Sequence, residues 1–245
     1  MIHYLSKKQR LDNPKEDTQT SSIIGDLLHL PSDLFWVLLR NSCTDKVFLP
    51  VVCGEILDFE FWPHWDATGT VNTTIVEPDV FISFEEFDLI IEAKKYDESG
   101  QYENQWRNEI GSYYNNFPSQ DKKLIVVAIG GSKDMQKKDL TINRLLSDNK
   151  SKICSVPIFK CNWLSILIEV TRVLDEIQTI KYKDSIRSSH KRILQDVIRS
   201  FNIHSLYFLK WLDSLNRDNL NIGDSSIDVF KLQYRLNHTK NESNQ

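Results

Sequence analysis

Several features that mark whole classes of protein are scarce or missing in this chain of 245 residues. Its four cysteines form no CxxC pair and have no histidine at zinc-ligand spacing, which indicates reduced, partly buried thiols. No apolar run approaches the roughly 18 to 20 residues that cross a bilayer. The N-terminal segment lacks the apolar core of a secretory signal, so we expect a cytoplasmic protein that does not contact a membrane.

Excess positive charge is missing as well. The formal net charge is −4, so no global positive field attracts nucleic acid, and only local patches could bind a polyanion. The glycine pair at 130–131 lacks the GxxxxGK[ST] spacing of a phosphate-binding loop, and no GxSxG nucleophile turn occurs. Hydrophobic residues make up 40% of the chain and charged residues 26%, a composition typical of a soluble globular protein.

The order of the predicted elements favours an α/β fold. A helix after Pro31 is followed by three segments with strand character, a helix over 101–117 and a fully apolar strand over 123–129. We expect a further short helix over 143–149, then a strand and more helices. A strand-helix-strand passage predicts a mixed central sheet flanked by helices. The predicted organisation is a flexible N-terminal arm over 1–22, a main domain over 23–178 and a helical C-terminal extension with a polar tail over 179–245.

Charged residues interrupt the apolar segments that should form the sheet. Asp79 precedes one strand, and Glu92 and Lys94 lie in or just after the next, which is joined to the first by a predicted hairpin. With a period of two, Glu92 and Lys94 share one face of their strand. Burial of an unpaired carboxylate costs several kcal/mol, so a compensating partner is required. An ion pair between Glu92 and Lys94 is one candidate, and a divalent cation shared with Asp79 is the other.

The cation hypothesis explains more of the pattern. Two carboxylates on adjacent strands repel each other unless a cation or a proton intervenes. A Mg²⁺ site needs one or two carboxylates, with water and phosphate oxygens completing the coordination. An ammonium on the same face can hold a water or a developing anionic oxygen. Two acids and a lysine around an open metal position are the outline of a site for phosphodiester hydrolysis.

These residues carry a resemblance to a known superfamily. The Pro78-Asp79 pair, twelve intervening residues and then Glu92-Ala93-Lys94 resemble the PD-(D/E)xK signature of the restriction-endonuclease-like nucleases. The predicted order of elements over about residues 30 to 165 also resembles the α-β-β-β-α-β core of that superfamily. The resemblance implies that Asp79 and Glu92 bind Mg²⁺, for which Mn²⁺ can substitute, and that Lys94 positions or activates the attacking water.

Two further site residues follow from the resemblance. Many members carry an additional glutamate on the first core helix, and Glu55 is the upstream candidate for a third metal ligand, with Asp58 and Glu60 as competitors. Some exonuclease-like branches place a glutamine and a tyrosine four residues apart on the helix after the lysine. Gln105 matches the glutamine and is included as a catalytic residue, but Glu109 stands where the tyrosine would be. An exposed Gln105 beside a core Trp106 is the alternative.

Nucleic-acid contacts have one local signal, a basic stretch over 181–200. If its apolar residues dock the helix, the basic residues point outward and could follow phosphates. A solvated surface is the alternative. The predicted nucleic-acid contacts are Lys95, Arg187, Lys191 and Arg192.

The sequence therefore predicts a Mg²⁺-dependent nuclease that acts on DNA, with RNA as the alternative substrate. A small nuclease without its own motor or recognition domain suggests a component of a phage-defence, restriction or mobile-element system, with a partner protein or a second copy of itself. The competing hypothesis is a catalytically inactive nuclease-fold module that binds protein or nucleic acid.

Overall fold

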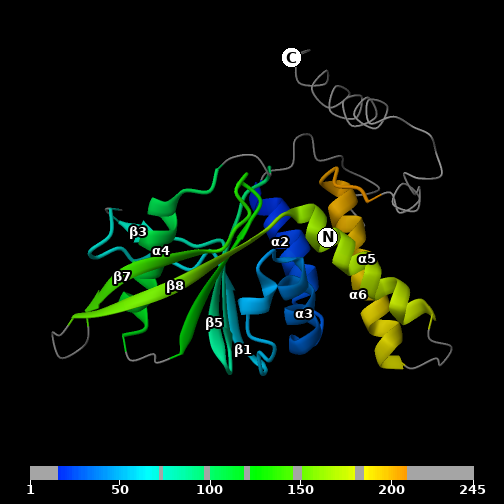
Figure 1. Cartoon of the computed structure of the whole chain (residues 1–245). Helices are drawn as coiled ribbons and strands as arrows, with labels where there is room; N and C mark the ends of the chain where they lie inside the picture. The colour runs from blue at the N-terminus through cyan, green and yellow to red at the C-terminus, as the bar shows by residue number, and fades with distance from the viewer. Residues whose placement is uncertain are drawn as a thin grey trace, which may run out of the picture. The chain divides into compact units, whose positions relative to one another are not determined.

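A mixed six-stranded sheet forms the centre of the molecule (Figure 1). A computed structural model describes residues 16–71, 74–96, 100–118, 122–145, 151–179 and 185–208 of the chain. The strand order is β1-β4-β5-β6-β8-β7, in which β5, β6 and β8 run parallel and the other neighbours are antiparallel. The strands of this sheet are β1 (Ile56–Phe61), β4 (Val80–Phe84), β5 (Phe87–Ala93), β6 (Lys123–Ile129), β7 (Lys138–Leu145) and β8 (Ser151–Cys161).

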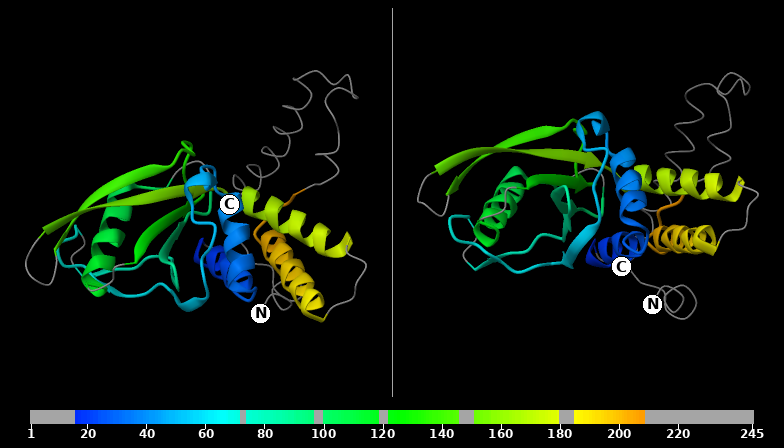
Figure 2. Two further views of the ribbon diagram at one scale, coloured as in Figure 1. Left: turned by 60° about the horizontal axis from the view of Figure 1, so that its bottom comes forward. Right: turned by 90° about the horizontal axis from the view of Figure 1, so that it is seen from below.

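Helices cover both faces of this sheet. Helix α4 (Glu103–Asn116) lies on one face, while α2 (Glu16–Leu27) and α3 (Ser32–Ser42) lie on the other (Figures 1 and 2). Helices α5 (Trp163–Thr179) and α6 (Ser185–Ile203) pack against each other, α5 against α3 and α6 against α2. A short helical turn, η1 (Lys46–Phe48), and a small sheet of β2 (Trp65–Asp66) and β3 (Ile75–Val76) complete the described elements.

The central strand β5 is buried along its whole length, including its two acidic residues, Asp88 and Glu92. Its Ile90 belongs to the core beneath α4, together with Phe81, Trp106 and Tyr113. On the opposite face the core contains aromatic contacts of Trp36 with Phe84 and Phe87, which joins α3 to the β4–β5 hairpin. By strand alternation, Asp88 and Glu92 share the Ile90 face and therefore lie under α4.

The predicted α/β class with a mixed central sheet is confirmed, and so are the strands β4, β5 and β6 and the helix α4. Three details differ. Helix α2 begins at Glu16 inside the predicted flexible arm, because it buries Gln19, Thr20 and Ile23. Residues 143–145 belong to strand β7, paired with β8, rather than to a short helix. Helix α6 lies in the same compact unit as the sheet instead of forming a separate extension.

The remaining parts of the predicted boundaries, residues 1–15 and 209–245, lie outside the described residues. Within the described part of the chain, no helix has the length and apolar character needed to cross a membrane.

Candidate active site

Asp79, Glu92 and Lys94 lie together at the open end of the β4–β5 hairpin, the end opposite its turn. Asp79 directly precedes β4, and its Oδ2 accepts a hydrogen bond of 2.8 Å from the Ala93 N–H at the end of β5. Glu92 is 1% exposed, and its Oε1 forms an ion pair with Lys94 Nζ. The backbone of Lys94 continues the pairing of β5 with β6 through a 2.8 Å hydrogen bond to the Ile129 carbonyl. The structure thus brings together the three residues that the sequence predicts.

Helix α4 contributes two further side chains to this cluster. Gln105 Nε2 donates a 2.6 Å hydrogen bond to Glu92 Oε1, so Gln105 points at the predicted site as expected. Glu109 lies one helical turn further along the same face of α4 and is 1% exposed. Neither carboxylate oxygen of Glu109 accepts an ordinary hydrogen bond, and nor does Glu92 Oε2. The two carboxyl groups interact with each other, however, and Gln105 also acts on Glu109, so a proton held between the two acids can satisfy part of this cluster.

The N-terminus of α2 supplies another carboxylate. Glu16 Oε1 lies 3.3 Å from Lys94 Nζ, and Glu16 Oε2 accepts a 2.9 Å hydrogen bond from the Lys95 N–H. Sequence reasoning assigned Glu16 to the arm and missed it. Its neighbours are polar and show no helical apolar pattern, so the sequence held little local signal for its position.

A two-glycine turn follows β6, and its second glycine makes room for Lys94. Gly130 and Gly131 both have positive φ angles, 67° and 65°, as a tight turn requires. A Cβ atom at Gly131 would lie 2.7 Å from Lys94 Cγ and 2.9 Å from Gln101 Cγ. The sequence predicted the turn, but it did not reveal that the Lys94 side chain packs against it.

Burial dominates the electrostatics of this cluster. It raises the pKa of Asp79 to about 7, with the Glu92 charge adding to the effect. Burial also raises the pKa of Glu92, although the Lys94 charge opposes it. The pKa of Glu109 lies well above its ordinary value because of burial and then the neighbouring Glu92 charge. For Lys94, burial disfavours the charged form, but ion pairs with Glu92 and Glu16 outweigh it and raise the pKa.

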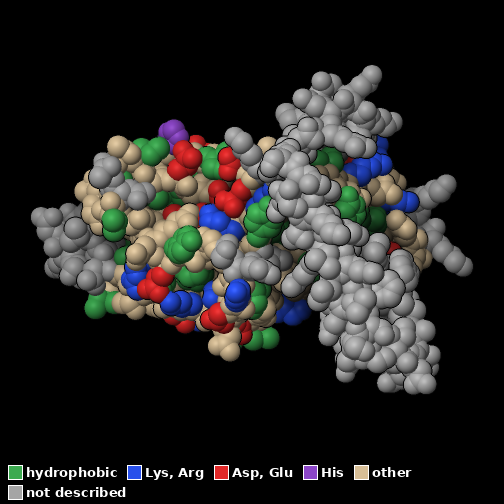
Figure 3. All heavy atoms as spheres, turned by 90° about the horizontal axis from the view of Figure 1, so that it is seen from above, with side chains coloured by type: hydrophobic (Ala, Val, Ile, Leu, Met, Phe, Trp, Pro, Cys, Tyr) green, Lys and Arg blue, Asp and Glu red, His purple; other side chains and the backbone are tan. Residues whose placement is uncertain are grey.

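The cluster adjoins a cavity with a volume of about 330 Å³, lined by Val76, Glu77, Gln105, Asn108 and Glu109. Gln105 and Glu109 therefore lie between the cavity and Glu92. On the face shown in Figure 3, Lys and Arg side chains are interspersed with Asp and Glu among the described residues.

Divalent cations fit this donor set. Hard cations such as Mg²⁺ and Mn²⁺ prefer carboxylate oxygens, and one or two carboxylates with water suffice for Mg²⁺. Buried carboxylate oxygens without any donor are the atoms that such a cation would satisfy. In the described part of the chain, no group of three or more His, Cys, Asp or Glu side chains is drawn together to hold a metal ion.

Other predicted site residues are not brought to this cluster. Glu55 precedes β1, whose Ile56 pairs with Phe84 beside the hairpin turn, so it lies at the opposite end of the strands from Glu92. Its Oε2 accepts a 2.7 Å hydrogen bond from Ser32 Oγ. The structure therefore does not bring Glu55 to the cluster, and the geometry gives no support to its predicted role as a third metal ligand. Its competitors Asp58 and Glu60 are exposed on the edge strand β1.

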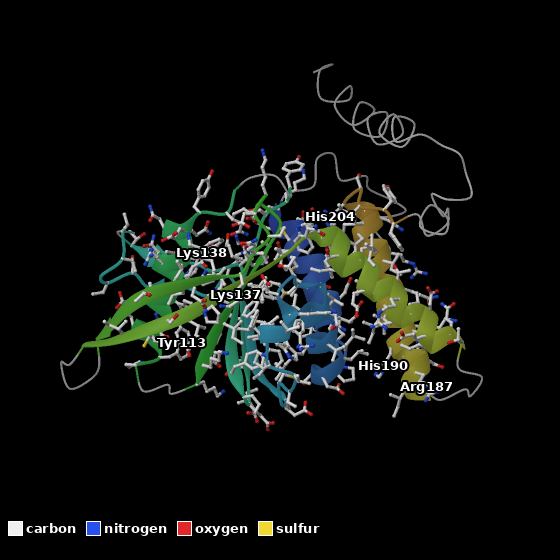
Figure 4. All side chains as sticks on the ribbon, viewed as in Figure 1. Tyr113, Lys137, Lys138, Arg187, His190 and His204 are labelled. Atoms are coloured by element: carbon white, nitrogen blue, oxygen red, sulfur yellow. The ribbon has the colours of Figure 1, made fainter. Side chains whose placement is uncertain are left out.

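The predicted nucleic-acid contacts lie in two places. Lys95 follows Lys94 at the cluster, with its ammonium 5.0 Å from the centre of the Tyr96 ring. Arg187 lies near the start of α6, whereas His204 directly follows the end of that helix (Figure 4). The His204 ring forms a hydrogen bond with Ser22 of α2, the helix whose first residue, Glu16, contacts Lys94. The C-terminal end of α6 is therefore the end that approaches the cluster. At a rise of about 1.5 Å per residue, Arg187 lies roughly 25 Å along α6 from His204. Lys191 and Arg192 lie between them.

Comparisons with known proteins add little. No protein-family model matches the chain, and no curated protein matches it. Among solved structures, one match is a chain in the refined half-complex from a tetradecameric assembly of Thermococcus gammatolerans McrB AAA+ hexamers with bound McrC. The two chains share 10% identity at a TM-score of 0.23, and the match covers 68% of this chain and 32% of that one. The chain thus spans about a third of that neighbour's length, and a likeness this weak carries no information about fold or activity.

Proposed function

We propose that the chain is a metal-dependent nuclease of the PD-(D/E)xK kind, which hydrolyses phosphodiester bonds in DNA. The observation that carries the proposal is the meeting of Asp79, Glu92 and Lys94 at one end of a buried hairpin, with Glu92 and its neighbour Glu109 left partly unsatisfied. The order α3-β1-β4-β5-α4-β6 supports it, since the proposed superfamily is built on an α-β-β-β-α-β core.

Each side chain has a role in this proposal. Asp79 and Glu92 would hold Mg²⁺ or Mn²⁺, which supplies Lewis acidity to the scissile phosphate and lowers the pKa of a bound water. The Lys94 ammonium holds the attacking water or a phosphate oxygen that gains charge in the transition state. Gln105 orients Glu92 through its hydrogen bond to Oε1. Water adds to phosphorus, the bond to the leaving sugar oxygen breaks, and that oxygen receives a proton.

The biological setting is a further part of the proposal. We place this activity in a phage-defence, restriction or mobile-element system, with recognition supplied by a partner protein or a second copy.

An inactive nuclease-fold module is the second candidate, favoured by one observation. The Glu92–Lys94 ion pair is largely buried and could be purely structural. Removal of either partner would then leave a buried charge and cost about 3 to 5 kcal/mol of stability.

The test compares wild type, Lys94→Met and Glu92→Gln in a plasmid-nicking assay with Mg²⁺, beside thermal melts of the same proteins. We expect Lys94→Met to lose at least about a hundredfold in cleavage while keeping cation-induced stabilisation, because an ammonium does not ligate a cation. Glu92→Gln should lose both. Lys133→Met, at an exposed position, is the matched control and should cut like wild type. A wild type that never cuts, with both variants strongly destabilised, would favour the inactive module.

A further inference from the structure

We infer that Tyr96 and Tyr102 stack on unpaired bases, so that the DNA cut at the candidate active site is single-stranded around the scissile bond. The inference rests on the proposed nuclease function and adds the class of substrate to it. It concerns only the nucleotides next to the cut, so contacts with duplex DNA elsewhere on the chain are compatible with it.

The first argument is the position of the two tyrosines. Tyr96 lies two residues after Lys94, and Tyr102 is the N-cap residue of α4. The Gly131 N–H donates a 2.6 Å hydrogen bond to the Tyr96 carbonyl. The Gly131 carbonyl accepts a 3.1 Å hydrogen bond from the N–H of Gln101, the residue before Tyr102. Both backbone segments are therefore anchored to the glycine against which the Lys94 side chain packs.

The second argument is the exposure of the two rings. Tyr96 is 60% exposed and Tyr102 is 65% exposed, whereas Trp106, one turn further along α4, is buried in the core. The Tyr102 side chain makes no capping hydrogen bond to its own helix, so neither the core nor the helix end explains its presence. Exposed aromatic rings that gather beside a candidate site are typical of a binding surface.

The third argument is the positive charge beside the rings. Lys95 Nζ lies 5.0 Å from the centre of the Tyr96 ring, and the Lys94 ammonium lies at the candidate active site. Proteins that bind single strands combine basic groups for the phosphates with aromatic rings for the bases. An acidic peptide would match the two lysines but would leave both rings without a stacking partner. A nucleic-acid strand therefore matches this surface more fully.

The fourth argument is the geometry of stacking. In a duplex both faces of a base are covered by its neighbours, so a side-chain ring reaches a base face only at a strand end or an unpaired nucleotide. Every base has such a face, so two tyrosines select for the state of the strand rather than for its sequence. The surface beside Lys94 therefore fits a single strand better than a continuous duplex.

The experiment measures binding of the full chain to labelled DNA by fluorescence anisotropy, with chelator present to suppress cleavage. The probes are an oligodeoxythymidylate of about 16 nucleotides, the same strand with abasic sites at its central positions, and a blunt duplex of equal length. We expect wild type to bind the oligodeoxythymidylate more tightly than the duplex and at least about fivefold more tightly than the abasic strand. Tyr96→Ala and Tyr102→Ala should each weaken binding to the oligodeoxythymidylate at least about fivefold. Both variants should bind the abasic strand like wild type, because it offers no base to stack on.

Two kinds of control variant accompany these measurements. Tyr96→Phe and Tyr102→Phe keep the ring without its hydroxyl group, so both should bind every probe like wild type. Phe48→Ala is the matched control, because Phe48 is 64% exposed on η1 with Lys137 Nζ 5.8 Å from the centre of its ring. It removes an exposed ring beside a lysine outside the candidate active site, and we expect it to leave binding unchanged.

Several outcomes would overturn the inference. If the alanine variants bind the oligodeoxythymidylate like wild type, or lose as much affinity for the abasic strand, the rings do not stack on bases. A wild type that binds the duplex as tightly as the single strand, or that binds no probe, also contradicts it. The plasmid-nicking assay decides the proposed function separately. Cleavage with unaffected tyrosine variants would leave the nuclease without this substrate class, whereas tyrosine-dependent binding without cleavage would support the stacking surface and overturn the nuclease.

Discussion

The two ends of β5 carry buried carboxylates in opposite states. Asp88, at the start of the strand, accepts hydrogen bonds of 2.6 Å from Tyr113 Oη and 2.7 Å from Ser83 Oγ, and Lys122 Nζ lies 3.6 Å away. Glu92, at the other end and on the same face, keeps one oxygen without a donor and faces another buried acid, Glu109. The same helix, α4, covers both ends.

The number of hydrogen-bond donors around each carboxylate distinguishes acids with a structural role from acids with a functional one. A satisfied buried carboxylate stabilises the packing around it, whereas an unsatisfied one is a cost that folding alone does not explain. The buried carboxylate at the Glu92 end therefore destabilises the metal-free fold, whereas the one at the Asp88 end does not. We propose that cation binding offsets this destabilisation.

Loss of the charge at Asp88 is expected to have the largest effect on stability. Asp88→Asn weakens two hydrogen bonds to a charged acceptor, each worth about 1.5 to 3 kcal/mol, and leaves Lys122 without its counter-charge. We expect a loss of about 3 kcal/mol in urea unfolding with chelator present. Cation binding should be unchanged, because Asp88 lies at the other end of the strand. A variant as stable as wild type would show that the Asp88 end is not the structural one.

The pH dependence of stability should reveal the Asp79 end. The pKa of Asp79 is raised to about 7, so between roughly pH 4 and pH 7 the folded state holds a proton that the unfolded state has released. The stability of the metal-free protein should therefore fall as pH rises through this window. Three pKa units correspond to about 4 kcal/mol, and because the interacting Glu92 carboxyl shares this titration, we expect Asp79→Asn to remove about half of that, about 2 kcal/mol.

The titration of His204 provides an internal control for this measurement. Burial lowers its pKa to about 4, so its contribution has the opposite sign and is lost as pH falls. The difference between wild type and Asp79→Asn isolates the aspartate. Parallel pH profiles for the two proteins would contradict the raised pKa of Asp79.

Much of the site could be predicted from the sequence because it depends on local pattern. Strand alternation put Glu92 and Lys94 on one face, and a short turn fixed Asp79 on the neighbouring strand. Gln105 was predicted from the resemblance, which places a glutamine on the helix after the lysine. Glu109 was visible too, since it lies four residues after Gln105 and therefore on the same side of the helix. That spacing was available, but it was interpreted only as a missing tyrosine.

Other features depend on long-range packing that no local pattern contains. The position of Glu55 could not be predicted locally, because the register of β1 with β4 places it beside the hairpin turn, at the opposite end of the strands from Glu92. Glu16 was missed because α2 is ordered by its contacts with α6, which is distant in sequence. Residues 143–145 form a strand because β8 pairs with them, whereas the sequence predicted a short helix over 143–149, of which 146–149 lie outside the described residues.

Removal of the Glu109 charge should slightly stabilise the metal-free protein, whereas removal of the Asp88 charge should destabilise it. Glu109→Gln keeps a polar amide beside Glu92 and Gln105 and relieves the repulsion between the Glu109 and Glu92 charges. At alkaline pH with chelator present, we expect the variant to be more stable than wild type by about 1 kcal/mol in urea unfolding. Glu103→Gln on the same helix serves as the matched control. A loss as large as that of Asp88→Asn would mean that Glu109 is held by a structural partner.

Neutralisation of the basic residues on α6 should have the smallest effect on stability. Replacement of Arg187, Lys191 and Arg192 by glutamine is expected to change the free energy of unfolding by less than about 0.5 kcal/mol, as for other surface substitutions.

If DNA reaches from the Glu92 end of β5 along α6, the triple variant should bind all DNA sequences more weakly. It should also lose about one unit of salt slope for each phosphate contact removed. The measurement is the affinity for several unrelated duplexes over a range of salt concentrations. Arg199→Gln is the control on the same helix, because Arg199 already pairs with Asp196. An unchanged salt slope with binding intact would assign the phosphate contacts to the Glu92 end alone, where Lys95 lies.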